Sequence, residues 1–158
     1  MTAPTLTQTP KASPADLPWI PTGDGKSFLP LRFGVDSWSE LMRLEPGSVV
    51  DLHRHTGTVH AVNLTGSRLI DENGEIVGPG DYVYEPPGTV DSWRCHGEEP
   101  CTLFIVVTDR VEYLDRDGNV IGFASAETQH QIYEDWCRSH HLPLRLSLPT
   151  QPAANLRR

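Results

Sequence analysis

The sequence predicts an all-β protein, built as an antiparallel sandwich or barrel and followed by a single late helix. Strand-forming residues recur in short runs, and turn signals separate these runs every eight to twelve residues or so, roughly as in known all-β folds. The chain of 158 residues also contains 14 Pro and 13 Gly, which favours many turns over long helices. Its length allows one domain with a hydrophobic core and is too short for two domains of typical size.

The predicted strands are bounded by residues that break the chain. In order they cover residues 28–33, 38–45, 48–55, 59–65, 74–77, 81–86, 92–96, 102–108, 111–115 and 119–124. Glu-Asn-Gly at residues 72–74 and Asp-Gly-Asn at residues 117–119 tolerate positive φ, as tight hairpins require. We therefore expect hairpins at both places.

The helix is predicted over residues 126–142. Ser125 is a suitable N-cap, apolar residues recur at helical spacing after it, and Pro143 follows the segment. Both ends of the chain are rich in Thr, Pro, Ser and Ala, so they have too little apolar surface to offset the entropy lost on ordering. We expect a disordered tail over residues 1–16, one domain over 17–142 and a flexible tail over 143–158.

Composition excludes several classes of partner. The formal net charge of −8 repels phosphate backbones and anionic membrane surfaces, so neither nucleic acid nor a membrane is expected to bind. The first residues contain no signal-peptide pattern, and no stretch of about 20 apolar residues occurs, so a cytoplasmic protein is expected. Cys95, Cys101 and Cys137 include no Cys-x-x-Cys pair, which favours buried thiols over disulfides or a zinc-cysteine site.

The stretch DLHRHTGTVH, residues 51–60, holds three of the seven histidines. Alternate side chains of a strand share one face, so His53 and His55 should project together while Arg54 faces away. Their Cα atoms would lie about 7 Å apart, which lets both imidazoles meet one metal ion. His60 follows a Thr-Gly-Thr turn, and a hairpin would swing it back over the same place. The alternative is that the His-x-His pair forms an exposed loop edge.

The spacing around these histidines resembles the first motif of the cupin family. That motif runs Gly, five residues, His-x-His, three or four residues, Glu, and six residues to Gly. Gly47, His53 and His55 match it, whereas His60 stands where the family has Glu and Gly66 comes one residue early. The resemblance makes His60 either a fourth metal ligand or a neighbouring group that donates a hydrogen bond to a bound oxygen or to another ligand.

A second cupin motif runs Gly, five residues, Pro-x-Gly, two residues, His, and three residues to Asn. This chain has Gly80, the Pro-Pro-Gly turn at residues 86–88 and then Asp91 at the position of the histidine, with Cys95 in place of Asn. The resemblance implies a cupin-type double-stranded β-helix, or jelly-roll barrel, with one C-terminal helix, in which Asp91 joins His53 and His55 as a metal ligand. The alternative is that Asp91 is a turn residue and the metal site is lost.

The order of segments from about Trp19 to Leu142 looks like the small non-haem iron dioxygenases that cleave 2,4'-dihydroxyacetophenone. This likeness rests on four segments of the sequence: HRHTGTVH, GDYVYEPPGTVDSW, TLFIVV and YLDRDGNVIG. It implies an Fe(II)-dependent cleavage by O2 of the bond between a ketone carbon and its hydroxymethyl carbon, which gives an aryl carboxylate and formate. It also implies a small-molecule substrate and O2 as partners, and a homodimer or homotetramer.

Two further residues near Asp91 are candidates for a role in the site. Glu85 comes directly before the Pro-Pro-Gly turn, where it could orient a ligand or accept a proton, or lie exposed in the turn. Trp93 shares the parity of Asp91 on a short strand, so it either lines the substrate pocket or belongs to the core. The other histidines have no matched partner and are expected at the surface: His96, His130, His140 and His141.

Two other functions stay open on the same fold. A metal-dependent isomerase, lyase or hydrolase would use Zn, Mn or Ni as a Lewis acid, and Asp91 in place of His favours this by changing the donor charge. The third reading is a non-catalytic metal-binding sensor, like the cupin domains of some anti-sigma factors.

Overall fold

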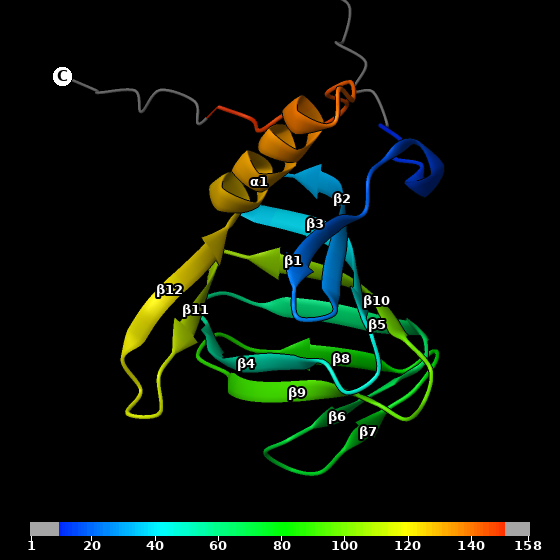
Figure 1. The fold of residues 1–158 in the computed structure, drawn as a ribbon. Helices are drawn as coiled ribbons and strands as arrows, with labels where there is room; N and C mark the ends of the chain where they lie inside the picture. The colour runs from blue at the N-terminus through cyan, green and yellow to red at the C-terminus, as the bar shows by residue number, and fades with distance from the viewer. Residues whose placement is uncertain (1–9, 151–158) are drawn as a thin grey trace, which may run out of the picture.

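The structure, a computed structural model, describes residues 10–150, so the parts of the two predicted tails over 1–9 and 151–158 lie outside the described residues. Two six-stranded sheets face each other, and a helix packs across one end of them (Figure 1). The predicted all-β jelly-roll fold with a C-terminal helix is confirmed. No helix in the described part of the chain is long and apolar enough to cross a membrane.

Both sheets are antiparallel throughout. The strands of the first sheet lie in the order β1 (Ile20–Gly23), β2 (Lys26–Phe33), β3 (Ser37–Leu44), β10 (Cys101–Thr108), β5 (Val59–Thr65) and β8 (Tyr82–Glu85). Those of the second sheet lie in the order β12 (Val120–Ser125), β11 (Arg110–Leu114), β4 (Val49–His55), β9 (Val90–His96), β6 (Ser67–Ile70) and β7 (Ile76–Val77). The short 3-10 helix η1 (Pro14–Asp16) precedes β1, and α1 (Ala126–Ser139) follows β12.

Each predicted strand segment contains a strand, but two further strands were not predicted. β1 contains Pro21 and Gly23, and β6 begins with Ser67 and Arg68. Both strands are four residues long and contain few strand-forming residues, so hydrophobic periodicity gave no signal for them.

The hydrophobic core lies between the two sheets. Trp38, Val59 and Leu103 contribute from the first sheet, and Trp93 and Val111 contribute from the second. All five are buried. The burial of these side chains is the main force that holds the two sheets face to face.

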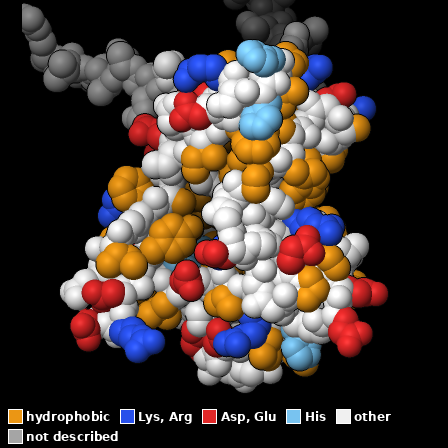
Figure 2. Space-filling view, viewed as in Figure 1, with side chains coloured by type: hydrophobic (Ala, Val, Ile, Leu, Met, Phe, Trp, Pro, Cys, Tyr) orange, Lys and Arg blue, Asp and Glu red, His pale blue; other side chains and the backbone are white. Residues whose placement is uncertain are grey.

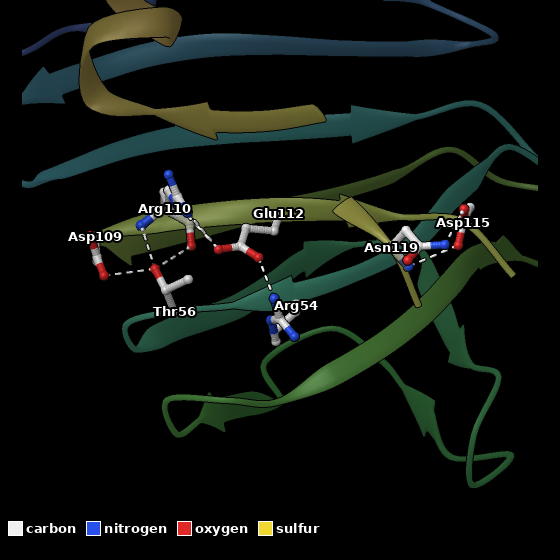
Figure 3. Close-up of polar contacts among 7 residues, drawn as sticks. All are labelled: Arg54, Thr56, Asp109, Arg110, Glu112, Asp115 and Asn119. Carbon is white, nitrogen blue, oxygen red and sulfur yellow. Dashed lines mark hydrogen bonds and ion pairs between the residues drawn. The ribbon is translucent and has the colours of Figure 1, made fainter. Parts of the chain in front are cut away.

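An ion-pair network on the outer side joins β4 to β11 (Figure 3). Arg54 of β4 and Arg110 of β11 both bind the carboxylate of Glu112, the latter at 2.8 Å. Because Arg54 faces outward, the histidines on either side of it face inward, as strand alternation predicted. At the tip of the β11–β12 hairpin, Asp115 accepts hydrogen bonds from the backbone and side-chain amides of Asn119, which forms the predicted turn.

α1 begins at the predicted N-cap and ends earlier than predicted. The Ser125 hydroxyl accepts a hydrogen bond from the Thr128 N–H at 3.3 Å, and the Thr128 hydroxyl accepts one from the Ser125 N–H at 2.8 Å. The helix ends at Ser139 rather than at residue 142, because His141 has a left-handed φ of 53°.

Residues 143–150 contain no helix or strand, yet they are fixed to the body of the protein. Leu146 and Leu148 pack against the core. The hydroxyl of the fully buried Tyr133 accepts hydrogen bonds from the backbone N–H groups of Arg145, at 2.7 Å, and Leu146, at 3.3 Å. Residues 143–150 therefore make contacts that the expectation of a flexible tail did not include.

We predict that Tyr133→Phe lowers the free energy of unfolding by about 1–2 kcal/mol, because the two backbone N–H groups lose their acceptor. Chemical denaturation measures this loss, and limited proteolysis should show faster cleavage at Arg145. Tyr84→Phe is the matched control, because the Tyr84 side chain is half exposed. Equal stability and equal cleavage of the two variants would contradict the prediction.

Candidate metal centre

An irregularity in the pairing of β4 with β9 positions the centre. Val50 lies opposite Trp93 and His53 lies opposite Asp91, so the chain advances three residues on β4 and two on β9. In a regular ladder Leu52 would face Asp91. The extra residue on β4 is a β-bulge, and it turns His53 to the interior beside Asp91.

The three predicted ligands come together inside the barrel. His53 Nε2 lies 2.9 Å from Asp91 Oδ1 and 3.1 Å from His55 Nε2. One donor atom from each residue lies within 4.8 Å of the others, and all three residues are buried. This group could hold a metal ion, because two imidazoles and one carboxylate converge and leave coordination positions open.

The orientation of the His53 ring supports this interpretation. Its Nδ1 lies 2.7 Å from the Asp51 carbonyl oxygen, so Nδ1 carries a proton and donates it there. The other ring nitrogen, Nε2, faces Asp91 Oδ1 at 2.9 Å. A positive charge, either a proton or a metal ion, is needed between these atoms.

Glu85 brings a second carboxylate to the group from the opposite sheet. It is buried at the end of β8, and its Oε2 lies 3.4 Å from His55 Nε2. The turn that follows is hydrogen-bonded to the backbone of His55: the Gly88 N–H donates to its carbonyl at 2.7 Å, and the His55 N–H donates to the Thr89 carbonyl at 2.9 Å. Gly88 has a φ of 89°, which favours glycine there.

Burial and mutual proximity shift the pKa values of these groups. Burial, followed by the charge of His53, lowers the pKa of His55 to about 4, so this ring is neutral at physiological pH. Burial and the neighbouring Asp91 raise the pKa of Glu85. Burial alone would raise the pKa of Asp91, but its contacts with His53 and Glu85 lower it below the usual range. Glu85 therefore holds the proton of the carboxyl pair and Asp91 is the ionised partner.

The structure does not bring His60 to this group. Its neighbours Val59 and Ala61 are buried, so His60 points outward from β5 and is exposed. Its Nδ1 lies 2.6 Å from the Tyr82 hydroxyl, and its ring lies 5.1 Å from that of Tyr84. The expectation that a hairpin swings His60 over the other histidines is wrong, because β5 belongs to the opposite sheet and carries His60 on the outer face.

Arg68 is a residue of the site that the sequence analysis missed. It lies on the unpredicted strand β6, and only 2% of it is exposed. Its guanidinium carbon lies 4.9 Å from the centroid of the Trp93 ring. Nε and Nη2 have no hydrogen-bond partner in the part of the chain that the structure describes. The one available signal was that Arg68 lies two residues before the apolar Ile70, so that in a strand both side chains would face the interior.

His53 and His55 face an inner cavity of about 70 Å³. Arg68, Glu85 and Trp93 line it together with His53 and His55. Other parts of its wall come from β3, β10, β11, β12 and α1: Trp38, Glu40, Met42, Ile105, Val107, Val111, Tyr113, Ala124 and Gln129. Trp93 therefore belongs both to the core and to the cavity wall.

The remaining histidines and the cysteines stay outside the centre. His96, His140 and His141 are exposed, as expected, and His130 packs edge-on against Phe33 with ring centroids 5.0 Å apart. The three cysteines are buried and form no disulfide within residues 10–150.

Comparisons with known proteins agree with the fold. The sequence matches the ChrR cupin-like domain family over residues 8–109, and no curated protein matches it significantly. The fold is similar to that of an RmlC-like cupin from Ralstonia eutropha, with a TM-score of 0.84, 23% identity and coverage of 90% of this chain and 95% of that one. It is also similar to an acetylacetone dioxygenase from Acinetobacter johnsonii, with a TM-score of 0.71, 16% identity and coverage of 85% of this chain and 96% of that one. A cupin sugar phosphate isomerase from Silicibacter pomeroyi has a similar fold, with a TM-score of 0.54, 21% identity and coverage of 73% of this chain and 91% of that one.

We predict that Asp91→Ala and His53→Ala each weaken metal binding by roughly 100-fold or more, because each removes one of three converging donors. Chelator competition followed by elemental analysis measures the affinity.

His60→Ala is the matched control and should bind metal as the wild type does, because its ring lies on the outer face of β5. Asp91→His should also retain metal, because an imidazole replaces the carboxylate as donor. Unchanged affinity in Asp91→Ala, or a comparable loss in His60→Ala, would show that the ligands are assigned wrongly.

A second prediction concerns Glu40. Burial raises the pKa of its carboxyl group from 4.5 to about 7, although hydrogen bonds from Gln129 and Trp38 act to lower it. Between these pH values the folded state binds more protons at Glu40 than the unfolded state, so stability falls as pH rises. Glu40→Gln removes this effect. Relative to the wild type, the variant should gain on the order of 3 kcal/mol by pH 8, with the gain disappearing below about pH 4.5.

Denaturation at a series of pH values measures the difference, with the exposed Glu127→Gln as control. A difference between Glu40→Gln and the wild type that does not change with pH would refute the assigned shift.

Proposed function

The chain belongs to the cupin superfamily, in the family of ChrR cupin-like domains, and on this premise we propose that it is an Fe(II)-dependent dioxygenase. We propose that it uses O2 to cleave the bond between the ketone carbon and the hydroxymethyl carbon of a small aryl hydroxyketone. The observation that carries the proposal is the convergence of the buried side chains of His53, His55 and Asp91 beside the inner cavity. Two histidines and one carboxylate with open positions are the donor set of many non-haem Fe(II) oxygenases.

The reaction balances without a nicotinamide or flavin. The aryl hydroxyketone and one O2 give one aryl carboxylic acid and one formic acid, and each product receives one oxygen atom from O2. An Fe(II) ion bound by the three donors would supply positions for the substrate oxygens and O2, lower the pKa of the substrate hydroxyl and provide electrons to O2.

The residues around the centre suit the charges that this reaction develops. Glu85 lies 3.4 Å from His55 and holds the proton of its pair with Asp91, so it is placed to exchange a proton with the substrate. The unpartnered N–H groups of Arg68 can bind a substrate oxygen that becomes negative. Trp93 holds the guanidinium plane in position by stacking.

Part of the cavity wall is apolar. Trp38, Val107 and Val111 are buried and line the cavity, and Ile105 packs beside them. A dry site strengthens the electrostatic contacts of Glu85 and protects reactive oxygen species from unwanted proton transfer.

A Lewis-acid isomerase, lyase or hydrolase is the second candidate, with Zn, Mn or Ni as the metal. Asp91 is the observation that favours it, because a carboxylate in place of a third histidine adds negative charge to the donor set and changes the metal preference. The likeness to a cupin sugar phosphate isomerase supports this candidate. A non-catalytic sensor is the third reading.

We also propose that the partners are a small-molecule substrate and O2, because the net charge of −8 disfavours nucleic acid and anionic membranes. The homodimer or homotetramer expected from the resemblance stays a prediction.

The deciding experiment compares the protein loaded with Fe(II) and with Zn(II) on a panel of aryl 2-hydroxyketones and 1,3-diketones. We expect the Fe(II) form to consume one O2 per substrate cleaved and to place one atom of 18O2 in each product, with no O2 uptake by the Zn(II) form. An oxygen electrode and mass spectrometry measure the two quantities.

Asp91→Ala should lower the rate by roughly 100-fold or more, and His60→Ala should retain it. Product formation by the Zn(II) form without O2, and no uptake by the Fe(II) form, would replace the dioxygenase by the Lewis-acid enzyme.

A further inference from the structure

Arg68 is the one buried arginine among the described residues. Its exposed fraction is 2%, and it forms no ion pair within residues 10–150. The arginines that do form ion pairs have side chains that are 40–74% exposed: Arg43, Arg54, Arg94, Arg110 and Arg138. A buried charge is costly unless a partner of opposite charge contacts it. The environment of Arg68 therefore lacks an anion in direct contact.

The unpartnered donors of Arg68 share one edge of its guanidinium group. Nε and Nη2 are buried, and neither has a hydrogen-bond partner among the described residues. Their N–H groups point in parallel, which matches the two oxygens of a carboxylate. The ring of Trp93 lies against the guanidinium, with its centroid 4.9 Å from the guanidinium carbon, and this contact helps to fix the plane of the donors.

The inner cavity beside Arg68 limits the size of such a ligand. Sites for drug-sized molecules usually enclose about 300–1,000 Å³. The inner cavity has about 70 Å³, so it suits an anion with few non-hydrogen atoms. Val50, Ile105 and Val107 form an apolar part of the same wall and can cover the carbon atoms of an organic acid.

A second hollow offers a route to this cavity. The outer hollow, of about 430 Å³, lies between α1 and the β11–β12 hairpin, and hydrophobic side chains gather over that hairpin (Figure 2). Burial raises the pKa of Glu40 at the junction to about 7, so a large share of molecules carry no charge there at neutral pH. The two spaces share six lining residues: Glu40, Met42, Val50, Tyr113, Ala124 and Gln129.

A bound divalent metal makes the surroundings of Arg68 positive. Glu85 and Asp91 are the carboxyl groups that attract Arg68, and burial keeps the neighbouring thiol of Cys101 neutral by raising its pKa. With both carboxyl groups ionised, two negative charges face three positive ones, from Arg68 and the metal. Protonation of either carboxyl group makes the balance more positive. An anion is therefore the complementary ligand of the metal-bound form.

We propose that Arg68 binds the carboxylate group of a small organic acid in the inner cavity when the centre holds a metal ion. A neutral ketone or hydroxyl oxygen can accept hydrogen bonds from Arg68 but leaves its charge unbalanced. Inorganic phosphate has no apolar part to meet the apolar wall. The aryl hydroxyketone has no carboxylate, so the acid is a second kind of ligand, and the inference does not depend on the dioxygenase reaction.

The test measures binding of acetate and acetamide to the Zn(II)-loaded full chain by ligand-observed NMR titration. Acetamide has a similar shape without the charge, and Zn(II) excludes redox chemistry. We expect acetate to bind at least about tenfold more tightly than acetamide, because its hydrogen bonds to Arg68 are charge-assisted. The metal-free chain should bind acetate at least about tenfold less tightly, because two positive charges are removed.

Variants of Arg68 locate the bound acetate. Arg68→Met removes the charge and the donors at similar length and should weaken acetate about tenfold or more, with less than about a threefold change for acetamide. Arg68→Lys keeps the charge without the two parallel N–H groups, so its affinity should be intermediate. Arg94→Met is the matched control and should bind acetate as the wild type does, because Arg94 is exposed and pairs with Asp71. Zinc content should be equal in all variants.

Three results would overturn the assignment. The first is a wild type that binds acetate no better than acetamide or does not bind it. The second is an Arg68→Met variant that keeps the wild-type affinity for acetate, because the metal alone would then hold the acid. The third is equal affinity for acetate with and without metal. If Arg68→Met does not fold, Arg68→Lys and the comparison of acetate with acetamide decide the question.

Discussion

The metal-binding group depends on one β-bulge. Between the pairs Val50–Trp93 and His53–Asp91, β4 has one residue more than β9, and this lets donor atoms from both strands converge. That residue places His53 opposite Asp91 and leaves His55 facing the same interior. Outside the barrel, Arg54 and Glu112 fix β4 to β11. The bulge and the ion pair together hold the two imidazoles in one orientation, which matters because a misplacement of about 1 Å is costly for a binding or catalytic group.

The centre concentrates groups that a hydrophobic core would normally exclude. His53, His55, Asp91, Glu85 and Arg68 are all buried, and several of their polar atoms lack a hydrogen-bond partner among the described residues. Such a cluster lowers the stability of the fold, because each group loses contact with water. Two features offset this loss of stability. The 86–89 turn is hydrogen-bonded to the backbone of His55, and apolar side chains from both sheets pack around the centre.

The sequence predicted those parts of the site that depend on local periodicity. Strand alternation placed His53 and His55 on one face and Arg54 on the other, and the resemblance to the cupin motifs singled out Asp91. His60 was misplaced because its direction depends on which face of β5 packs inward, a property of sheet pairing. Arg68 was missed because a strand of only four residues is too short to give a clear alternating pattern. The Glu40–Gln129 contact joins residues 89 positions apart, so no local pattern could predict it.

Asp91 changes the centre beyond the identity of one ligand. A third histidine would leave a bound Fe(II) with its full charge of two, whereas a carboxylate neutralises one unit of it. Without metal, the proton that Glu85 holds limits the negative charge of the carboxyl pair, and the buried guanidinium of Arg68 lies close enough to attract both carboxyl groups. A metal ion that binds Asp91 therefore weakens the need for a proton on Glu85, since the cation now balances the pair. In the proposed metal-bound form, this exchange would couple metal binding to proton release inside the cavity, and Glu85 would become a proton acceptor only after the metal had bound.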